Sequence, residues 1–132
     1  MTPTNPAELI LTRGIPGSGK STWARAWGAA GVPGARLRVN RDDLRFSTFG
    51  AYSGLDRHQE ETITLLQQSM VEAALRARVS VVVDDTNLTH RFAKEWLRLA
   101  AKVGVPYQFK DFNVPLERAL AWTQMRDRHV PD

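Results

Sequence analysis

Residues Gly14 to Ser21 (GIPGSGKS) combine glycines, a lysine and a hydroxyl in the order G-x-x-x-x-G-K-[ST], which is typical of a phosphate-binding loop. The glycines let the backbone curl so that successive N–H groups point at one anion. Lys20 supplies a mobile positive charge for the β- and γ-phosphates of a nucleotide, and the Ser21 hydroxyl can bind Mg²⁺. We therefore expect ATP or another nucleoside triphosphate, with Mg²⁺, to bind at this loop. The residues expected to bind it are Gly14, Pro16, Gly17, Ser18, Gly19, Lys20, Ser21 and Thr22.

An aspartate pair, Asp84-Asp85, directly follows the valine-rich run 79–83. A carboxylate at the end of an apolar strand is the Walker B arrangement, in which it holds Mg²⁺ opposite the loop hydroxyl, directly or through water. The alternative is a strand-terminal turn, because aspartate and asparagine are common turn residues. We favour the metal role, and the pattern leaves open which of the two aspartates serves.

A second aspartate pair, Asp42-Asp43, follows the run 36–39. A kinase needs a carboxylate near the γ-phosphate to accept the proton of the acceptor hydroxyl. Asp42 is the predicted general base. The alternative is that one of the pair caps a helix or forms an ion pair with Arg41 or Arg45.

Charge on the transferring phosphoryl group also needs cationic cover, which an arginine can supply. Arg126, near the end of the last predicted helix, is the candidate. The alternative is a basic residue that simply suits the negative end of the helix dipole.

The glycine loop and both aspartate pairs lie beyond the ends of predicted strands. The strands expected are 9–13, 36–39, 79–83 and 107–112, and the helices expected are 21–29, 57–77, 89–103 and 116–126. Alternating strands and helices indicate parallel β-α-β units, and ligands of such sheets bind beyond the carboxyl ends of the strands. We therefore predict an α/β fold with helices on both faces of a parallel sheet.

Local signals set several boundaries. Asp56 is a predicted N-cap with Gln59 three residues later, Thr89 is another N-cap, and Gly104 ends a helix. Residues 46–55 lack periodicity and are predicted to form a loop. The helix 57–77 is predicted to have one apolar stripe that faces the core and a polar face exposed to solvent. The stripe is Ile63, Leu66, Met70, Ala73, Ala74 and Ala77, and the polar face is Gln59, Glu60, Glu61, Gln67 and Glu72.

The composition fits one ordinary globular domain over residues 1–132, with 42% hydrophobic and 24% charged residues. The absence of cysteine excludes disulfides, thiolate metal sites and cysteine nucleophiles, and no histidine spacing suggests zinc. No apolar run approaches 18 residues and no signal peptide is visible, so we expect a cytoplasmic protein without a membrane partner and with a disordered leader over residues 1–7. The net charge of +4 is compatible with a polyanionic partner, or with arginines on solvated helix faces.

Taken together, the sequence resembles the polynucleotide 5′-hydroxyl kinase family, in particular the kinase domain of the bacteriophage end-healing polynucleotide kinase/phosphatase. The matching blocks span nearly the whole chain: GIPGSGKSTWAR (14–25), NRDDLR (40–45), DTNL (85–88), FNVP (112–115), and Arg126 before Val130-Pro131. The first block is shared by many phosphotransferases, whereas the pairing of the next two is more particular. The resemblance implies a P-loop kinase fold with four or five parallel strands.

The resemblance also implies roles. Lys20 and Ser21 would bind the phosphates and Mg²⁺, Asp42 would be the base on a 5′-hydroxyl of DNA or RNA, and Arg126 would cover the β- and γ-phosphates from a lid. Arg45 would contact the phosphate 3′ to the accepting nucleoside. The expected substrate side is Arg41, Asp42, Arg45, Asp85 and Thr86.

The sequence also departs from the family. Asp84 stands where the phage enzyme has serine, and the stretch after NRDDLR matches less closely. No D-x-D-G-T phosphatase signature occurs, so only kinase activity is implied. Residues 124–132 would begin the lid, and the closing helix expected after them is missing, as in a truncated or minimal form.

Two other functions remain open at this point. One is a P-loop kinase of a small hydroxyl compound such as a nucleotide sugar, as in zeta-toxin-like kinases. The other is a non-catalytic NTP-binding module. The sequence leaves the oligomeric state open.

Overall fold

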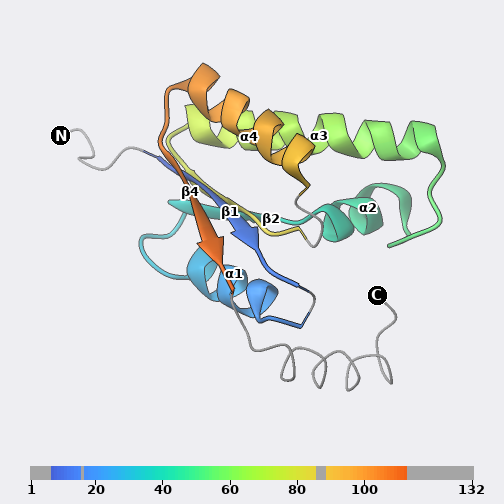
Figure 1. Ribbon diagram of the computed structural model, residues 1–132, viewed down its shortest axis with the longest axis horizontal. Helices are drawn as coiled ribbons and strands as arrows, with labels where there is room; N and C mark the ends of the chain where they lie inside the picture. The colour runs from blue at the N-terminus through green and yellow to red at the C-terminus, as the bar shows by residue number, and fades with distance from the viewer. Residues whose placement is uncertain (1–6, 16, 86–88, 113–132) are drawn as a thin grey trace.

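The computed structural model describes residues 7–15, 17–85 and 89–112 (Figure 1). Within these ranges strands and helices alternate as the sequence predicts. The elements are β1 (Leu9–Arg13), α1 (Lys20–Ala29), β2 (Arg36–Val39), α2 (Arg41–Phe49), α3 (Arg57–Arg76), β3 (Ser80–Val83), α4 (His90–Val103) and β4 (Tyr107–Asp111).

The four described strands form one parallel sheet in the order β2-β3-β1-β4. Val83 pairs with Leu11 of β1 on one side and with Val39 of β2 on the other, so the carboxyl ends of these three strands lie at one edge. The predicted α/β fold is confirmed. The prediction was four or five strands, and the described residues form four.

Helices α3 and α4 lie on one side of the sheet and α1 lies on the other (Figure 1), and alternation along the central strands gives each side its own core layer. Leu9 and Leu11 of β1 belong to the cluster under α3 and α4, whereas Ile10 between them packs with Ala24 of α1 on the opposite face. Side chains that point alternately to the two faces explain why residues 9–11 of β1 and 81–83 of β3 are apolar without interruption. Burial on both faces fixes the register, and therefore fixes where each strand ends.

The predicted helix boundaries at α3 and α4 are confirmed. Asp56 accepts a hydrogen bond from the Gln59 N–H while the Gln59 side chain accepts one from the Asp56 N–H, which is a capping box. Thr89 caps α4 by accepting from the Phe92 N–H, and Gly104 ends α4 with φ 83°. These caps satisfy groups that would otherwise be orphaned at the helix ends.

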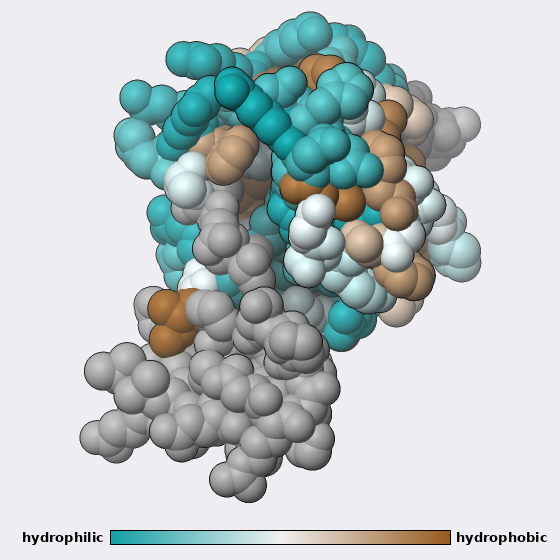
Figure 2. Space-filling model, turned by 90° about the vertical axis from the view of Figure 1, so that its right-hand side faces the viewer, coloured by the Kyte–Doolittle hydropathy of each residue, from teal (hydrophilic) through white to brown (hydrophobic). Residues whose placement is uncertain are grey.

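The loop predicted over residues 46–55 is wrong in its first half, because α2 extends through Phe49. Asn40 begins α2 by accepting a hydrogen bond from the Asp43 N–H at 2.9 Å, and Gly50 ends it with φ 76°. No side chain of α2 is buried. A surface helix of this kind has no apolar stripe for sequence reasoning to detect, and it lies toward the end of the molecule that Figure 2 faces.

The stripe predicted for α3 is partly wrong. Ile63 is buried as expected, but Leu66 and Met70 are each 40% exposed. Gln67, predicted on the polar face, is only 3% exposed. The residues that α3 buries are Ile63, Gln67, Val71 and Leu75. The buried stripe is therefore rotated relative to the predicted one, and it brings a polar side chain into the interior.

Several predictions fall outside the described residues. They are the helix 116–126, the lid over 124–132, and all of the leader except Ala7, which is buried against the core. None of the described helices is both long enough and apolar enough to cross a membrane.

Candidate active site

The carboxyl edge of the sheet brings together three polar segments that are distant in sequence (Figure 1). The glycine loop follows β1, the first turn of α2 follows β2, and Asp84-Asp85 follow β3. Hydrogen bonds join the last two segments. The Arg41 N–H donates to Asp85 Oδ1 at 2.8 Å, and the Asn40 amide donates to the Asp84 carbonyl. The predicted meeting of these segments at one edge is confirmed for the described residues.

The glycine loop has a backbone that requires glycine at particular positions. Gly14 and Gly19 have φ of 150° and 94°, in the region that disfavours other residues. A Cβ on Gly14 would lie 2.9 Å from Ser18 Oγ and 3.0 Å from the Phe112 Cβ, whereas a Cβ on Gly19 would meet nothing within 4 Å. Gly14 therefore serves close packing across the loop, and Gly19 serves the turn into α1.

Lys20 is the first residue of α1 and is only 5% exposed. Its Nζ donates a hydrogen bond to the Gly14 carbonyl, so the ammonium group lies back over the loop. Burying an ammonium is costly unless anions or acceptors surround it. A phosphate group in the loop would supply the negative charge that this position favours.

Ser18 gives an independent indication that the loop fits an anion. Its hydroxyl oxygen is buried and, among the described residues, is the single buried side-chain polar atom without a hydrogen-bond partner. Such an atom is unfavourable in a finished interior and is expected where a ligand completes the site. The loop residues present therefore fit the phosphates of a nucleotide.

Asp84, one of the two candidates for Mg²⁺, is almost fully buried, with 2% of its surface exposed. Its Oδ2 accepts a hydrogen bond from Arg38 Nε at 2.9 Å and forms an ion pair with Arg38 Nη2 at 2.8 Å. The same guanidinium reaches Asp43 Oδ2 at 2.7 Å. Arg38, to which sequence reasoning assigned no role, thus ties the aspartates at the ends of β2 and β3 together.

Asp85, the other candidate, is fixed by two donors. Oδ1 accepts from the Arg41 N–H, and Oδ2 accepts from the Gln67 amide at 2.9 Å. Burial raises the pKa of the Asp85 carboxyl, and the hydrogen bonds from Arg41 and Gln67 oppose that rise. The buried amide of Gln67 therefore holds this carboxylate in place.

The donor set fits a metal that takes most of its ligands from elsewhere. No group of three or more acidic, histidine or cysteine side chains that could hold an ion occurs in residues 7–15, 17–85 and 89–112. Mg²⁺ in phosphoryl-transfer sites is usually held by one or two protein oxygens together with substrate phosphates and water. The Ser21 hydroxyl in the first turn of α1 and a carboxylate after β3 are compatible with that arrangement.

The candidate base Asp42 lies in the first turn of α2, and its side chain is 49% exposed. Its Oδ1 accepts a hydrogen bond from Arg45 Nη1, one turn further along the helix. The ion pair that the sequence left as an alternative is therefore present. Because the carboxylate stays half-exposed, the pair does not close it off from a substrate.

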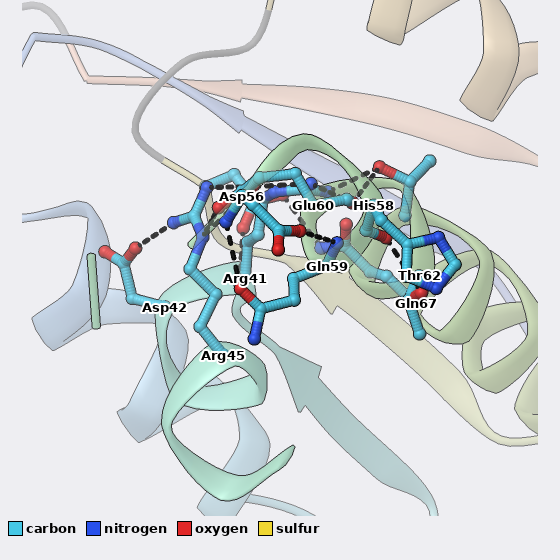
Figure 3. A network of polar contacts seen from close by, with 11 residues as sticks. Arg41, Asp42, Arg45, Asp56, His58, Gln59, Glu60, Thr62 and Gln67 are labelled. Carbon is cyan, nitrogen blue, oxygen red and sulfur yellow. Dashed lines mark hydrogen bonds and ion pairs between the residues drawn. The ribbon is translucent and has the colours of Figure 1, made fainter. Parts of the chain in front are cut away.

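Glu60 on α3 holds both arginines of the NRDDLR block (Figure 3). Arg45 donates to Glu60 from Nε at 3.0 Å and from Nη2 at 2.9 Å, and Arg41 Nη2 donates to the Glu60 carboxylate at 3.0 Å. The Arg41 guanidinium also donates to the Glu60 carbonyl and to the Thr64 hydroxyl. The hydrogen bond from Arg45 is the main cause that lowers the pKa of Glu60.

Sequence reasoning missed Glu60, Gln67 and Arg38. The sequence pattern places Glu60 and Gln67 on the outer face of α3. The two residues are seven positions apart and therefore lie on one side of the helix. That spacing is the signal that could have indicated a polar seam directed at the edge of the sheet.

Three of the predicted site residues, Pro16, Thr86 and Arg126, lie outside the described residues. Thr22 is described, and it is exposed in the first turn of α1.

Comparison with known proteins places the chain in a family. The model of the AAA domain family matches residues 9–132. A protein of Autographa californica nuclear polyhedrosis virus, named "Putative bifunctional polynucleotide kinase/RNA ligase", is 31% identical over an alignment of 136 positions. The alignment covers 94% of this chain and 19% of that protein.

Solved structures agree. A chain of the Pnkp1/Rnl/Hen1 RNA repair complex is 30% identical, with a TM-score of 0.83 over 98% of this chain and 40% of that one. Chaetomium thermophilum Kti12, solved with ADP-AlF3, is 20% identical with a TM-score of 0.70 and supports the fold alone. The chain thus spans less than half the length of the viral protein and of the RNA repair chain that it matches. It belongs to the AAA domain family, whose P-loop binds nucleotides, and its resemblance to polynucleotide kinases is confirmed.

Proposed function

We propose that this domain transfers the γ-phosphate of ATP to the 5′-hydroxyl end of DNA or RNA. The observation that carries the proposal is the placement of Asp42 and Arg45 on one face of α2, at the sheet edge where the phosphate loop also lies. One side chain suits a proton acceptor and the other suits a phosphate ligand. Relatives named as polynucleotide kinases support the same chemistry.

In this proposal the loop N–H groups and Lys20 bind the β- and γ-phosphates of ATP. The Ser18 hydroxyl, which has no partner among the described residues, donates to a phosphate oxygen. Mg²⁺, held in part by Ser21 and by Asp84 or Asp85, would neutralise charge on the phosphates. Arg126 would cover the β- and γ-phosphates from the segment beyond the described residues.

Asp42 accepts the proton of the 5′-hydroxyl as the oxygen attacks the γ-phosphorus. A bond forms between the 5′-oxygen and phosphorus, the bond from phosphorus to the β–γ bridging oxygen breaks, and ADP leaves. The carboxylate is well suited to this role because it is half-exposed at the start of a helix.

Arg45 binds the phosphate on the 3′ side of the accepting nucleoside. Its guanidinium already shares its donors between Asp42 and Glu60, so an incoming phosphate competes with Asp42 for Nη1. That competition releases the Asp42 carboxylate toward the hydroxyl. Arg41, whose donors go to Asp85, Glu60 and Thr64, supports the substrate side by positioning these groups.

The test is the transfer of label from γ-labelled ATP to a 5′-hydroxyl oligonucleotide by the wild type and by Asp42→Asn. Loss of a general base costs about 10²- to 10⁴-fold in rate, so we expect a loss of that size. Asp43→Asn, in the same turn of α2, is the matched control and should retain most activity. Equal activity of wild type and Asp42→Asn would refute the assigned role.

The choice of acceptor is tested by salt. Binding of a polynucleotide weakens steeply with salt, because the protein's cations displace counterions from the phosphates. A flat salt response, with phosphorylation of a small hydroxyl compound in place of the oligonucleotide, would instead indicate the small-acceptor kinase. Tight ATP binding without transfer to any acceptor would indicate a non-catalytic module.

A further inference from the structure

Two aromatic side chains stack on each other at the surface next to the candidate acceptor residues. Phe46, in α2, is 50% exposed, and Tyr52, in the segment after α2, is 56% exposed. Their ring centroids are 4.6 Å apart and their planes differ by 13°. Figure 2 faces this end of the molecule, where apolar side chains gather beside hydrophilic ones.

The helix geometry places Phe46 on the same face of α2 as the candidate base, and Tyr52 stacks on Phe46. Asp42 and Phe46 are four residues apart, so their Cβ atoms are neighbours at about 5–6 Å. Arg45 and Phe49 repeat that spacing on the adjacent row, and Phe49 is 38% exposed. One face of α2 thus presents a carboxylate, a guanidinium and aromatic rings, in order of distance from the sheet edge.

The fold itself does not use most of this aromatic surface. No side chain of α2 is buried, and α2 is held to α3 through the polar contacts of Arg41 and Arg45. Large aromatic groups left half in water forgo the free energy that burial would provide. Such groups beside a cationic side chain are typical of surfaces that bind single-stranded nucleic acid, because every base offers a flat π-face.

We propose that the stacked pair Phe46–Tyr52 is the base-stacking site for the acceptor strand. It takes the nucleobase next to the accepting nucleoside, on the 3′ side of the phosphate that Arg45 binds. The proposal rests on the proposed kinase function for its orientation, since the 5′-hydroxyl must lie at Asp42. The adjacent guanidinium and the continuity with the acceptor residues specify a nucleic-acid strand as the occupant.

The test uses the wild type first and needs no variant. Hexanucleotides with a 5′-hydroxyl and a single abasic site at position 1, 2 or 3 are compared with the intact strand for KM and, without ATP, for direct binding by anisotropy. Removal of one stacked base is worth about 5- to 150-fold in affinity. We expect a loss in that range at position 2, and a fluorescent 2-aminopurine at position 2 should be quenched on binding.

The variants then assign the effect to the aromatic pair. Phe46→Ala with Tyr52→Ala should raise the KM of the intact hexanucleotide by a similar factor, leave the KM of ATP unchanged, and remove the penalty of the abasic site. Phe46→Leu keeps an apolar side chain in the helix and should lose the 2-aminopurine quenching. Tyr107→Ala, which removes a 49% exposed aromatic from β4, is the matched control and should behave as wild type.

The outcomes separate this proposal from the kinase assignment. If the hexanucleotide binds and an abasic site at position 2 weakens that binding, but no phosphate is transferred, the stacking site stands and the proposed function fails. If the wild type phosphorylates intact and abasic strands equally well, or if position 1 alone matters, the kinase assignment stands and the stacking site at Phe46–Tyr52 is wrong.

Discussion

Glu60 offers the sharpest prediction about how the acceptor side is built. Its carboxylate accepts hydrogen bonds from Arg45 at 2.9 and 3.0 Å and from Arg41 at 3.0 Å, and its side chain is 33% exposed. Glu60→Gln keeps the shape but removes the charge and turns half of the acceptor fork into a donor. Arg45 then loses its fixed position relative to Asp42.

The size of the effect follows from these contacts. Hydrogen bonds to charged groups contribute about 1.5–3 kcal/mol when shielded, and solvent-exposed ion pairs contribute about 0–1 kcal/mol. For groups that are partly exposed we expect a loss of about 1–2 kcal/mol in stability. We expect the displaced Arg45 to lose a similar free energy of binding to the acceptor phosphate, which corresponds to about a 5- to 30-fold loss in kcat/KM for an oligonucleotide acceptor.

The assay compares kcat/KM for a 5′-hydroxyl oligonucleotide with that for a nucleoside without a 3′-phosphate. The loss should appear with the oligonucleotide and nearly vanish with the nucleoside, because in the proposed mechanism Arg45 binds the acceptor phosphate. Glu61→Gln is the matched control, since Glu61 pairs only with the highly exposed Arg57 among the described contacts. If Glu60→Gln and Glu61→Gln behave alike with both acceptors, the positioning role is refuted.

The same carboxylate gives a dependence of stability on pH. The pKa of Glu60 is lowered in the folded state from its ordinary value of 4.5, chiefly by the Arg45 hydrogen bond. Its contribution is therefore present above about pH 4.5 and is lost as pH falls through the lower folded-state pKa. Chemical unfolding between pH 3 and 6 should show a smaller fall of stability at the acid end in Glu60→Gln than in wild type, and parallel curves would contradict this.

Two further substitutions test the rest of the site. Gly14→Ala would place a Cβ 2.9 Å from Ser18 Oγ and strain a backbone with φ 150°. We therefore expect a loss of about 1–3 kcal/mol, either in the free energy of unfolding or in the free energy of nucleotide binding. An unchanged melting temperature together with normal ATP affinity would contradict the packing argument. Gln67→Leu removes a hydrogen-bond donor from the charged form of Asp85, so the pKa of Asp85, already raised by burial, should rise further. The acid limb of the kcat/KM profile should then move to higher pH. The control Gln68→Leu should leave the profile unchanged.

The sequence predicted well those features that depend on neighbours along the chain. The phosphate loop, the capping box at Asp56 and the strand ends that carry Asp42 and Asp85 are all local patterns. Each of these patterns indicates one local physical requirement: a positive φ, a helix cap or burial of a strand on both faces.

The features that sequence reasoning missed depend on partners distant in the chain. Glu60 and Gln67 look like solvent-facing residues until α3 is packed on the sheet, where they meet Arg45 and Asp85. Helix α2 escaped notice because it buries no side chain and so has no apolar period. Its described contacts with α3 and with the end of β3 are polar, and a pattern of apolar and polar residues does not detect such contacts.

The central claim is tested most directly by end-labelling. A 5′-hydroxyl decanucleotide and the same strand with a 5′-phosphate are incubated with γ-labelled ATP, Mg²⁺ and the protein. We predict that label enters the hydroxyl strand, at its 5′ end, and does not enter the phosphorylated one. Label in neither strand while ATP is bound, or equal label in both, would contradict the proposed chemistry.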